Sequence, residues 1–178
     1  MTSMGIAAVC HLNYGLIFQQ TQRREGRCIN MQISSRFTLA VHILTCIAVI
    51  KEMKVTSNLL AGSTNTNPVI VRKILGQLKN AGLVEVARGT GGASLAKPAD
   101  EINFFDIYQA VECINKGELF HFHENPNEQC PIGHNIHAVL DDKLEQVQRT
   151  MEQKLASISL ADVQREILQY INAETTKK

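Results

Sequence analysis

The stretch from Asn65 to Gly92 constrains the fold of this chain more than any other. Asn67 followed by Pro68 predicts the start of a helix, because an asparagine side chain caps the first N–H groups and proline lacks the N–H that the first turn leaves unpaired. Apolar residues then recur at positions i, i+3, i+4 and i+7, which indicates one buried stripe, and Gly82 suits the position just after the helix. The residues of the stripe are Val71, Ile74, Leu75 and Leu78.

The other side of the same helix is basic, and a glycine-rich hairpin follows it. Arg72, Lys73 and Lys79 fall away from the apolar stripe. Residues 83–87 favour a β-strand, and a turn segment, Arg-Gly-Thr-Gly-Gly at 88–92, follows them. A helix able to enter a groove, followed by a basic hairpin, is the layout of a winged helix-turn-helix domain that binds DNA. The sequence therefore predicts a mainly α fold with a small β-hairpin wing.

The charges of the chain are segregated, although its net charge is only +1. Residues 31–99 hold eight basic and two acidic side chains, whereas residues 100–178 hold seven basic and fourteen acidic ones. This division predicts one surface that binds phosphates and another that avoids them. The lack of tryptophan and the small number of other aromatic residues argue against a β-sandwich or a propeller.

The five cysteines are odd in number and widely scattered, unlike those of a disulfide-rich secreted domain, so a cytoplasmic location is expected. Residues 4–18 are apolar but too short to span a membrane, and basic residues follow them rather than precede them. No signal peptide or membrane association is therefore predicted. Residues 1–30 are interpreted as a disordered extension or a translation start placed too early, with a targeting or regulatory arm as the alternative.

Two helices are predicted before the basic one. The first covers residues 34–50 and is apolar on nearly all sides, so it should be buried. The second is capped by the Thr-Ser pair at 56–57 and extends through Ala61, so that residues 62–67 form the turn before the basic helix. Together with the hairpin they complete a predicted DNA-binding domain over residues 31–99.

Two further helices and a long loop are predicted in the second half of the chain. An amphipathic helix over residues 103–113 and a loop over residues 115–133 form a region spanning 100–133. A long helix then carries one narrow apolar stripe, which should pack on the same helix of a second subunit. The pattern Ser-x-x-Asp at 159–162 caps a last helix, and residues 134–178 form the predicted dimerisation region. The stripe consists of Ile136, Leu140, Leu144, Val147, Met151, Leu155 and Ile158.

With these parts placed, the chain from Met31 to about Tyr170 resembles the Rrf2 family of bacterial winged helix-turn-helix transcriptional regulators, in its IscR- and CymR-like form. The resemblance implies a homodimer, joined by the long helix, that binds a palindromic operator on double-stranded DNA and represses transcription. The segments that carry it, in order along the chain, are MQISSRFTLAV at 31–41, NPVIVRKILGQLKNAGLV at 67–84, RGTGG at 88–92 and DIYQAVE at 106–112.

The resemblance also implies which residues contact DNA. The first turns of the basic helix would contact base edges in the major groove, and the hairpin tip would enter the neighbouring minor groove. Hydroxyl-bearing and basic residues nearby would bind phosphates and fix the register. The predicted base contacts are Asn67, Val69, Arg72 and Lys73. The predicted tip residues are Arg88, Gly89, Thr90 and Gly91. The predicted phosphate contacts are Ser34, Ser35, Arg36, Thr64 and Thr66.

The loop before the long helix suggests a sensor whose chemistry the residues leave open. Family members that bind an iron–sulfur cluster have three closely spaced cysteines there, whereas this loop holds only Cys130, so a cluster is not expected. His121, His123, Cys130 and His134 are of the types that bind zinc or another transition metal. Alternatively, Cys130 has a lowered pKa and senses redox conditions, with Cys113 as its disulfide partner. A loop without sensing chemistry, or one regulated by a partner protein, is the remaining interpretation.

The sequence thus favours a DNA-binding regulator over two other classes of protein. A metal-dependent enzyme could be built on the histidines of the loop, but no acid or base carboxylate has a recognisable spacing with them. An adaptor that kept the fold and lost DNA binding is the third class, and the basic excess of residues 31–99 argues against it.

Overall fold

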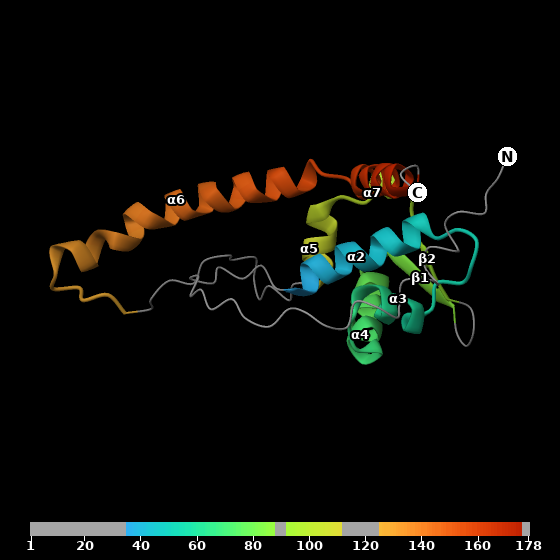
Figure 1. The fold of residues 1–178 in the computed structure, drawn as a ribbon. Helices are drawn as coiled ribbons and strands as arrows, with labels where there is room; N and C mark the ends of the chain where they lie inside the picture. The colour runs from blue at the N-terminus through green and yellow to red at the C-terminus, as the bar shows by residue number, and fades with distance from the viewer. Residues whose placement is uncertain (1–34, 88–91, 112–124, 176–178) are drawn as a thin grey trace, which may run out of the picture.

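The computed structural model describes residues 35–87, 92–111 and 125–175, in which helices form the bulk of the fold and two strands form a hairpin (Figure 1). The predicted fold class is confirmed. The elements are α2 (Ser35–Val49), α3 (Ser57–Thr64), α4 (Pro68–Asn80), β1 (Val84–Ala87), β2 (Gly92–Leu95), the 3₁₀ turn η1 (Ala99–Glu101), α5 (Phe104–Val111), α6 (Pro131–Ala156) and α7 (Leu160–Thr175).

α2 lies at the centre of the fold, and α3, α4, α5, α7 and β2 all pack against it. It is buried on most sides, as its apolar sequence predicts, because packing around such a helix removes its side chains from water on every face. It therefore positions both the helices before the hairpin and the last helix of the chain. The buried residues of α2 are Phe37, Ala40, Ile43, Leu44, Thr45, Ile47 and Ala48.

α3 is longer than the sequence predicts. Its first turn is capped by the Thr56 hydroxyl, as expected, but the helix continues past Ala61 to Thr64. Only residues 65–67 remain as the turn. The extension is possible because Asn65 adopts the left-handed conformation, at φ 47°, and its N–H closes the last turn of the helix. The polar run that looks like a turn in the sequence is the exposed end of a helix.

α4 begins and ends where the sequence predicts. The N–H of Val69 donates to Oδ1 of Asn67 over 2.8 Å, and Pro68 occupies the first turn. Gly82 follows the C-terminal residue Ala81 and has a φ of +71°, a conformation that an L side chain rarely adopts. The predicted apolar stripe of Val71, Ile74, Leu75 and Leu78 is buried.

The hairpin is attached to the body of the domain along one edge. β1 and β2 pair antiparallel, with Ala87 opposite Gly92. The N–H of Ala93 donates to the carbonyl of Val55 over 2.8 Å, which ties β2 to the segment before α3. Gly92 has a φ of +83°, and a Cβ there would lie 3.2 Å from the backbone N and O of Val55. Both facts require glycine at this position.

α5 follows η1 and packs on the start of α2. Two interactions fix its N-terminus. The N–H of Asp106 donates to Oδ1 of Asn103 over 2.9 Å, and the carboxylate of Asp106 forms an ion pair with Lys97 at 3.2 Å. The ring of Phe37 contacts the rings of Phe104 and Tyr108 edge to face. The described helix ends at Val111, and the two predicted residues beyond it lie outside the described residues.

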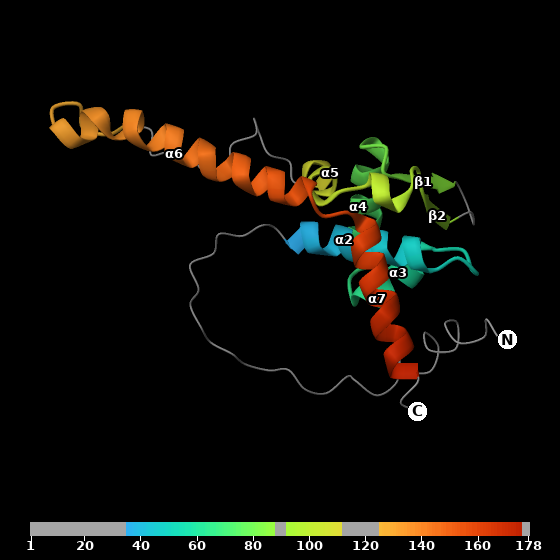
Figure 2. The same ribbon diagram turned by 90° about the horizontal axis from the view of Figure 1, so that it is seen from above.

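α6 is a long helix that extends away from the rest of the described chain (Figures 1 and 2). It begins at Pro131, so it includes the last three residues of the predicted loop, because proline suits the first helical turn and Cys130 takes the capping position. None of the residues Pro131–Ala156 is buried in this single chain. Of the predicted stripe, Met151 and Leu155, at the C-terminal end, pack against the core.

α7 runs at a steep angle to α6 and crosses α2 (Figure 2). The predicted capping box is confirmed, since the N–H of Asp162 donates to the Ser159 hydroxyl and the N–H of Ser159 donates to Oδ2 of Asp162, each over 3.1 Å. Leu160 is fully buried, and Nε2 of Gln164 donates to the carbonyl of Ala48 over 3.1 Å. These contacts fix the C-terminal end of α6 relative to the rest of the domain.

Replacing Ser159 with alanine is expected to lower the free energy of unfolding by about 1 kcal/mol, because the cap of α7 is lost. The hydroxyl of Ser159 is the main cause that lowers the pKa of Asp162 below its ordinary value, so this carboxylate stabilises the fold at neutral pH. The stabilisation should disappear as the pH falls through that lowered pKa. Urea unfolding at pH 7 and at pH 3 measures both effects.

The control for this substitution is Ser157→Ala. The hydroxyl of Ser157 donates to the carbonyl of Lys154 at an exposed position, so its removal should change the free energy of unfolding much less. Equal losses in the two variants would contradict the capping interpretation.

Candidate nucleic-acid interface

The exposed side of α4 carries the residues that the sequence predicts as base contacts. The side chain of Val69 is 63% exposed, and Arg72 and Lys73 are exposed one turn further along the helix. Asn67 is also exposed, and its Oδ1 accepts from the helix while its side-chain NH₂ is not used by the cap. These four residues therefore lie together on the first turns of α4.

The basic side chains of α4 differ from Arg149 and Arg165 in their ion pairing. Among the described residues, Arg72, Lys73 and Lys79 have no carboxylate partner within 4.0 Å. By contrast, Arg149 pairs with Glu145 and Arg165 pairs with Asp162. An exposed cationic face without internal counter-ions can neutralise an external polyanion at little cost, because no existing ion pair must be broken.

The residues predicted to bind phosphates are in differing situations. Ser35 and Arg36 are exposed in the first turn of α2, and Ser34 lies outside the described residues. The hydroxyls of Thr64 and Thr66 donate to the carbonyls of Leu60 (2.8 Å) and Thr64 (3.0 Å), respectively. A phosphate has only acceptors, so either threonine would have to rotate its hydroxyl to bind one. Their role in binding stays a prediction.

The tip of the hairpin, with the predicted contacts Arg88, Gly89, Thr90 and Gly91, lies outside the described residues. Its two strands are described, and they project on the same side of the domain as the N-terminus of α3 (Figure 1). Ala87 and Gly92, the described residues on either side of the tip, are paired with each other.

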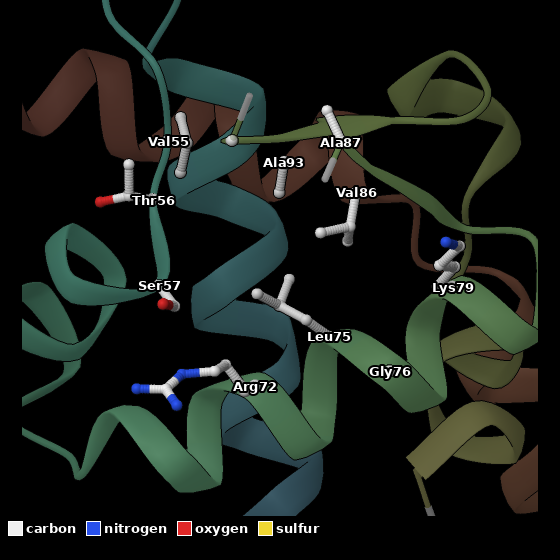
Figure 3. Close-up of a pocket in the computed structure, with 11 residues that line it drawn as sticks. Val55, Thr56, Ser57, Arg72, Leu75, Gly76, Lys79, Val86, Ala87 and Ala93 are labelled. Carbon is white, nitrogen blue, oxygen red and sulfur yellow. The ribbon is translucent and has the colours of Figure 1, made fainter. Parts of the chain in front are cut away.

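A groove separates α4 from the hairpin (Figure 3). Its volume is about 370 Å³. Apolar side chains of both elements point into its middle, and the two basic side chains Arg72 and Lys79 lie at its two ends along α4. Other residues that line it are Thr56, Ser57, Leu75, Gly76, Val86 and Ala93.

Of the predicted sensor residues, Cys130 and His134 lie at the N-terminal end of α6, away from the hairpin (Figure 1). Cys130 takes the capping position before Pro131, and the backbone N–H groups of Gly133 and Ile132 lower the pKa of its thiol. His134 is exposed one turn later. The proposed disulfide partner Cys113 lies outside the described residues.

The metal site predicted from the loop is only partly described. His121 and His123 lie outside the described residues, which leaves Cys130 and His134. Within residues 35–87, 92–111 and 125–175, no three or more His, Cys, Asp or Glu side chains are close enough to hold a metal ion. The predicted site for zinc or another transition metal therefore stays a prediction.

A comparison of the sequence with protein families gives a match over residues 33–166 to the Rrf2 model, described as an iron-dependent transcriptional regulator. The chain belongs to the Rrf2 family. It is 45% identical over 131 residues to YwnA of Bacillus subtilis (strain 168), provisionally named as an HTH-type transcriptional regulator; the match covers 74% of this chain and 96% of YwnA. This Rrf2 protein is therefore a DNA-binding transcription regulator, and its family and relatives are regulators rather than enzymes.

Solved structures agree with the fold of this Rrf2 protein. A crystal structure of a protein provisionally described as DNA-binding is 40% identical, covers 72% of this chain and 98% of its own, and has a TM-score of 0.58. IscR from T. potens is 23% identical, covers 76% of this chain and 88% of its own, and has a TM-score of 0.57, which shows the fold alone. In the described part of this chain, no helix is long and apolar enough to cross a membrane.

The sequence did not predict two features of this surface. Ile70 is 47% exposed beside Val69, although an isoleucine in a helix is usually assigned to the core. Ile70 does not belong to the i, i+3, i+4 stripe of α4, and this is the signal that could have predicted its exposure. The groove between α4 and the hairpin had no signal in the sequence, because it depends on how the two elements pack.

Proposed function

We propose that this Rrf2 protein is a homodimeric repressor that binds a palindromic operator in a sequence-specific manner. The observation that carries the proposal is the exposed face of α4, on which apolar and unpaired basic side chains lie together beside a hairpin. A helix with such a face fits the major groove of duplex DNA. Residues 31–99 are the proposed DNA-binding domain, residues 100–133 the sensor region and residues 134–178 the dimerisation region.

Each predicted residue then has a specific function at the DNA. Arg72 and Lys73 donate to acceptors on guanine, Asn67 bonds a base edge, and Val69 contacts a thymine methyl group. Arg88 at the hairpin tip enters the adjacent minor groove. The remaining predicted residues bind phosphates and fix the register on the duplex. These are Ser34, Ser35, Arg36, Thr64 and Thr66, whereas Gly89, Thr90 and Gly91 belong with Arg88 to the proposed minor-groove contact.

The proposed dimer is joined by α6. Val147 of the apolar stripe is 52% exposed, on a helix with no buried residue in the single chain. An isolated rod of this kind is unstable in water unless its apolar stripe is covered. A second copy of the same stripe covers it and places two copies of α4 about one helical turn apart on the DNA.

The experiment that tests the proposal measures binding of the full chain to the promoter region of its own gene at 50 and 200 mM salt. Binding to that region should exceed binding to unrelated DNA, and the affinity should fall by a factor of about 10³ or more if six or more phosphates are neutralised. Binding that is independent of salt or of sequence would contradict it.

For the signal, we propose that Cys130 senses peroxides. Its thiolate would attack the peroxide oxygen to give a sulfenic acid and hydroxide, and the thiol of Cys113 would then condense with it to a disulfide, releasing water. Its lowered pKa supports this, because the thiolate is the reactive form. Zinc binding by His121, His123, Cys130 and His134 would compete for the same sulfur.

Cys130 is expected to react with iodoacetamide at a lower pH than an ordinary cysteine, because its folded-state pKa lies below the usual thiol value. Mass spectrometry of its peptide after timed alkylation from pH 6 to pH 10 measures the midpoint. Cys46, whose sulfur lies 3.3 Å from Oγ of Ser63 on α3, is the internal control. A midpoint for Cys130 at or above that of Cys46 would exclude an activated thiol.

A further inference from the structure

The groove between α4 and the hairpin is bounded by two elements that the proposed function places in different grooves of DNA. Its walls are α4 on one side and the paired strands on the other, and the start of α3 closes one end (Figure 3). Arg72, Gly76 and Lys79 lie at i, i+4 and i+7 along α4, so they form the edge of the groove. The groove is therefore a channel that runs parallel to α4.

The described residues that line this groove are cationic, hydroxylic or apolar, and none of these is acidic. Among the described residues, neither Arg72 nor Lys79 has an ion-pair partner. Oγ1 of Thr56 accepts from the N–H of Leu59, so its O–H remains able to donate, as does the hydroxyl of Ser57. These donors suit an oxyanion, and the apolar floor suits a group such as a sugar.

When a helix lies in the major groove and its hairpin enters the adjacent minor groove, one sugar–phosphate strand separates the two. That strand must pass between the helix and the hairpin. We propose that this groove holds that strand, with one phosphate bound by Lys79 at one end of the groove and a neighbouring phosphate bound by the hydroxyl of Ser57 at the other end. The inference rests on the proposed function and adds two phosphate contacts to it.

Gly76 supports the inference by its position on the edge of the groove. A Cβ at this residue would meet nothing within 4 Å, so packing within the chain does not require glycine. Glycine inside a helix is less stable than alanine, which makes an unneeded glycine here a cost to folding. Its effect is to keep the groove open where the strand would pass.

The first arm of the test replaces single phosphates of a bound duplex with uncharged methylphosphonates, one position at a time. In the wild type, one replacement in the strand between the two grooves should weaken binding about tenfold, because a charge-assisted contact is lost. In Lys79→Ala the same replacement should cost less than twofold. Lys143→Ala, which removes an exposed lysine from α6, is the matched control and should keep the tenfold penalty.

The second arm fills the groove without changing its charge. Gly76→Leu places a side chain in open space on a helix, so the variant should be at least as stable as the wild type in urea. It should nevertheless bind the duplex tenfold or more weakly. Gly76→Ala is the control, with equal or higher stability and an affinity within about twofold of the wild type.

The outcomes separate the inference from the proposed function. If the wild type shows no salt-sensitive binding to DNA, both are wrong. If it binds but the methylphosphonate penalty is unchanged in Lys79→Ala, or Gly76→Leu binds as well as the wild type, only the inference is overturned. Binding of inorganic phosphate that depends on Lys79, without coupling to the methylphosphonate, would also overturn it, because the groove would then hold a free anion.

Discussion

Replacing Arg72 with alanine is expected to weaken binding to the operator by ten- to a hundredfold, because a bidentate contact to guanine contributes about 1–3 kcal/mol. The side chain is exposed on α4, and among the described residues it has no ion-pair partner, so its removal should change the free energy of unfolding by less than about 0.5 kcal/mol. Fluorescence anisotropy with a labelled duplex measures the affinity, and urea unfolding measures the stability. The double variant Arg72→Ala/Arg88→Ala should lose binding further.

The matched control for this variant is Arg149→Ala, which removes the same side chain from the exposed surface of α6. It should bind the operator as the wild type does, since α6 lies away from the proposed DNA surface (Figure 1). If both variants lost affinity equally, the effect would come from net charge rather than from a contact. An unchanged affinity in Arg72→Ala would remove this residue from the interface.

The double substitution Leu144→Glu/Val147→Glu in α6 is expected to convert the dimer to a monomer. Four carboxylates would then face one another where two copies of the stripe should pack, which is unfavourable without compensating charges. Because a dimer binds two half-sites as one event, the affinity for the full operator should fall at least a hundredfold. Analytical ultracentrifugation measures the mass, and anisotropy measures the affinity.

Gln146→Glu is the control for this variant, since it adds a carboxylate to the polar side of the same helix. It should remain a dimer and keep its affinity. A wild-type chain that sediments as a monomer at micromolar concentration would contradict the proposed role of α6 directly, whatever the variants do.

Local signals in the sequence predicted most of the fold. The Asn-Pro start of α4, its apolar stripe and Gly82 each have a direct structural cause in capping, burial and the left-handed backbone. The same holds for the capping box at Ser159 and Asp162. The family also followed from such segments, because their order along the chain is more specific than any one of them.

Signals that depend on context were less informative. The polar run after Ala61 reads as a turn but continues α3, because polar residues also suit the exposed end of a helix. Pro131 reads as part of a loop but begins α6, since proline favours both situations. In each case the local residue types fit two structures, and contacts with the rest of the chain decide between them.

The candidate site was predicted in part. The residues of α4 that face outward followed from the helical period, since whatever is not in the buried stripe is exposed. The groove, with Lys79 and Ser57 at opposite ends, was not predictable in this way. It joins residues far apart in the sequence, and only the packing of the hairpin against α3 and α4 brings them together.

The most direct test of the account is a hydroxyl-radical footprint of the full chain on the promoter region of its own gene. A dimer with two copies of α4 should protect two patches related by a twofold axis and centred about one helical turn, roughly 10 base pairs, apart. A single protected patch, or uniform protection along the duplex, would contradict it.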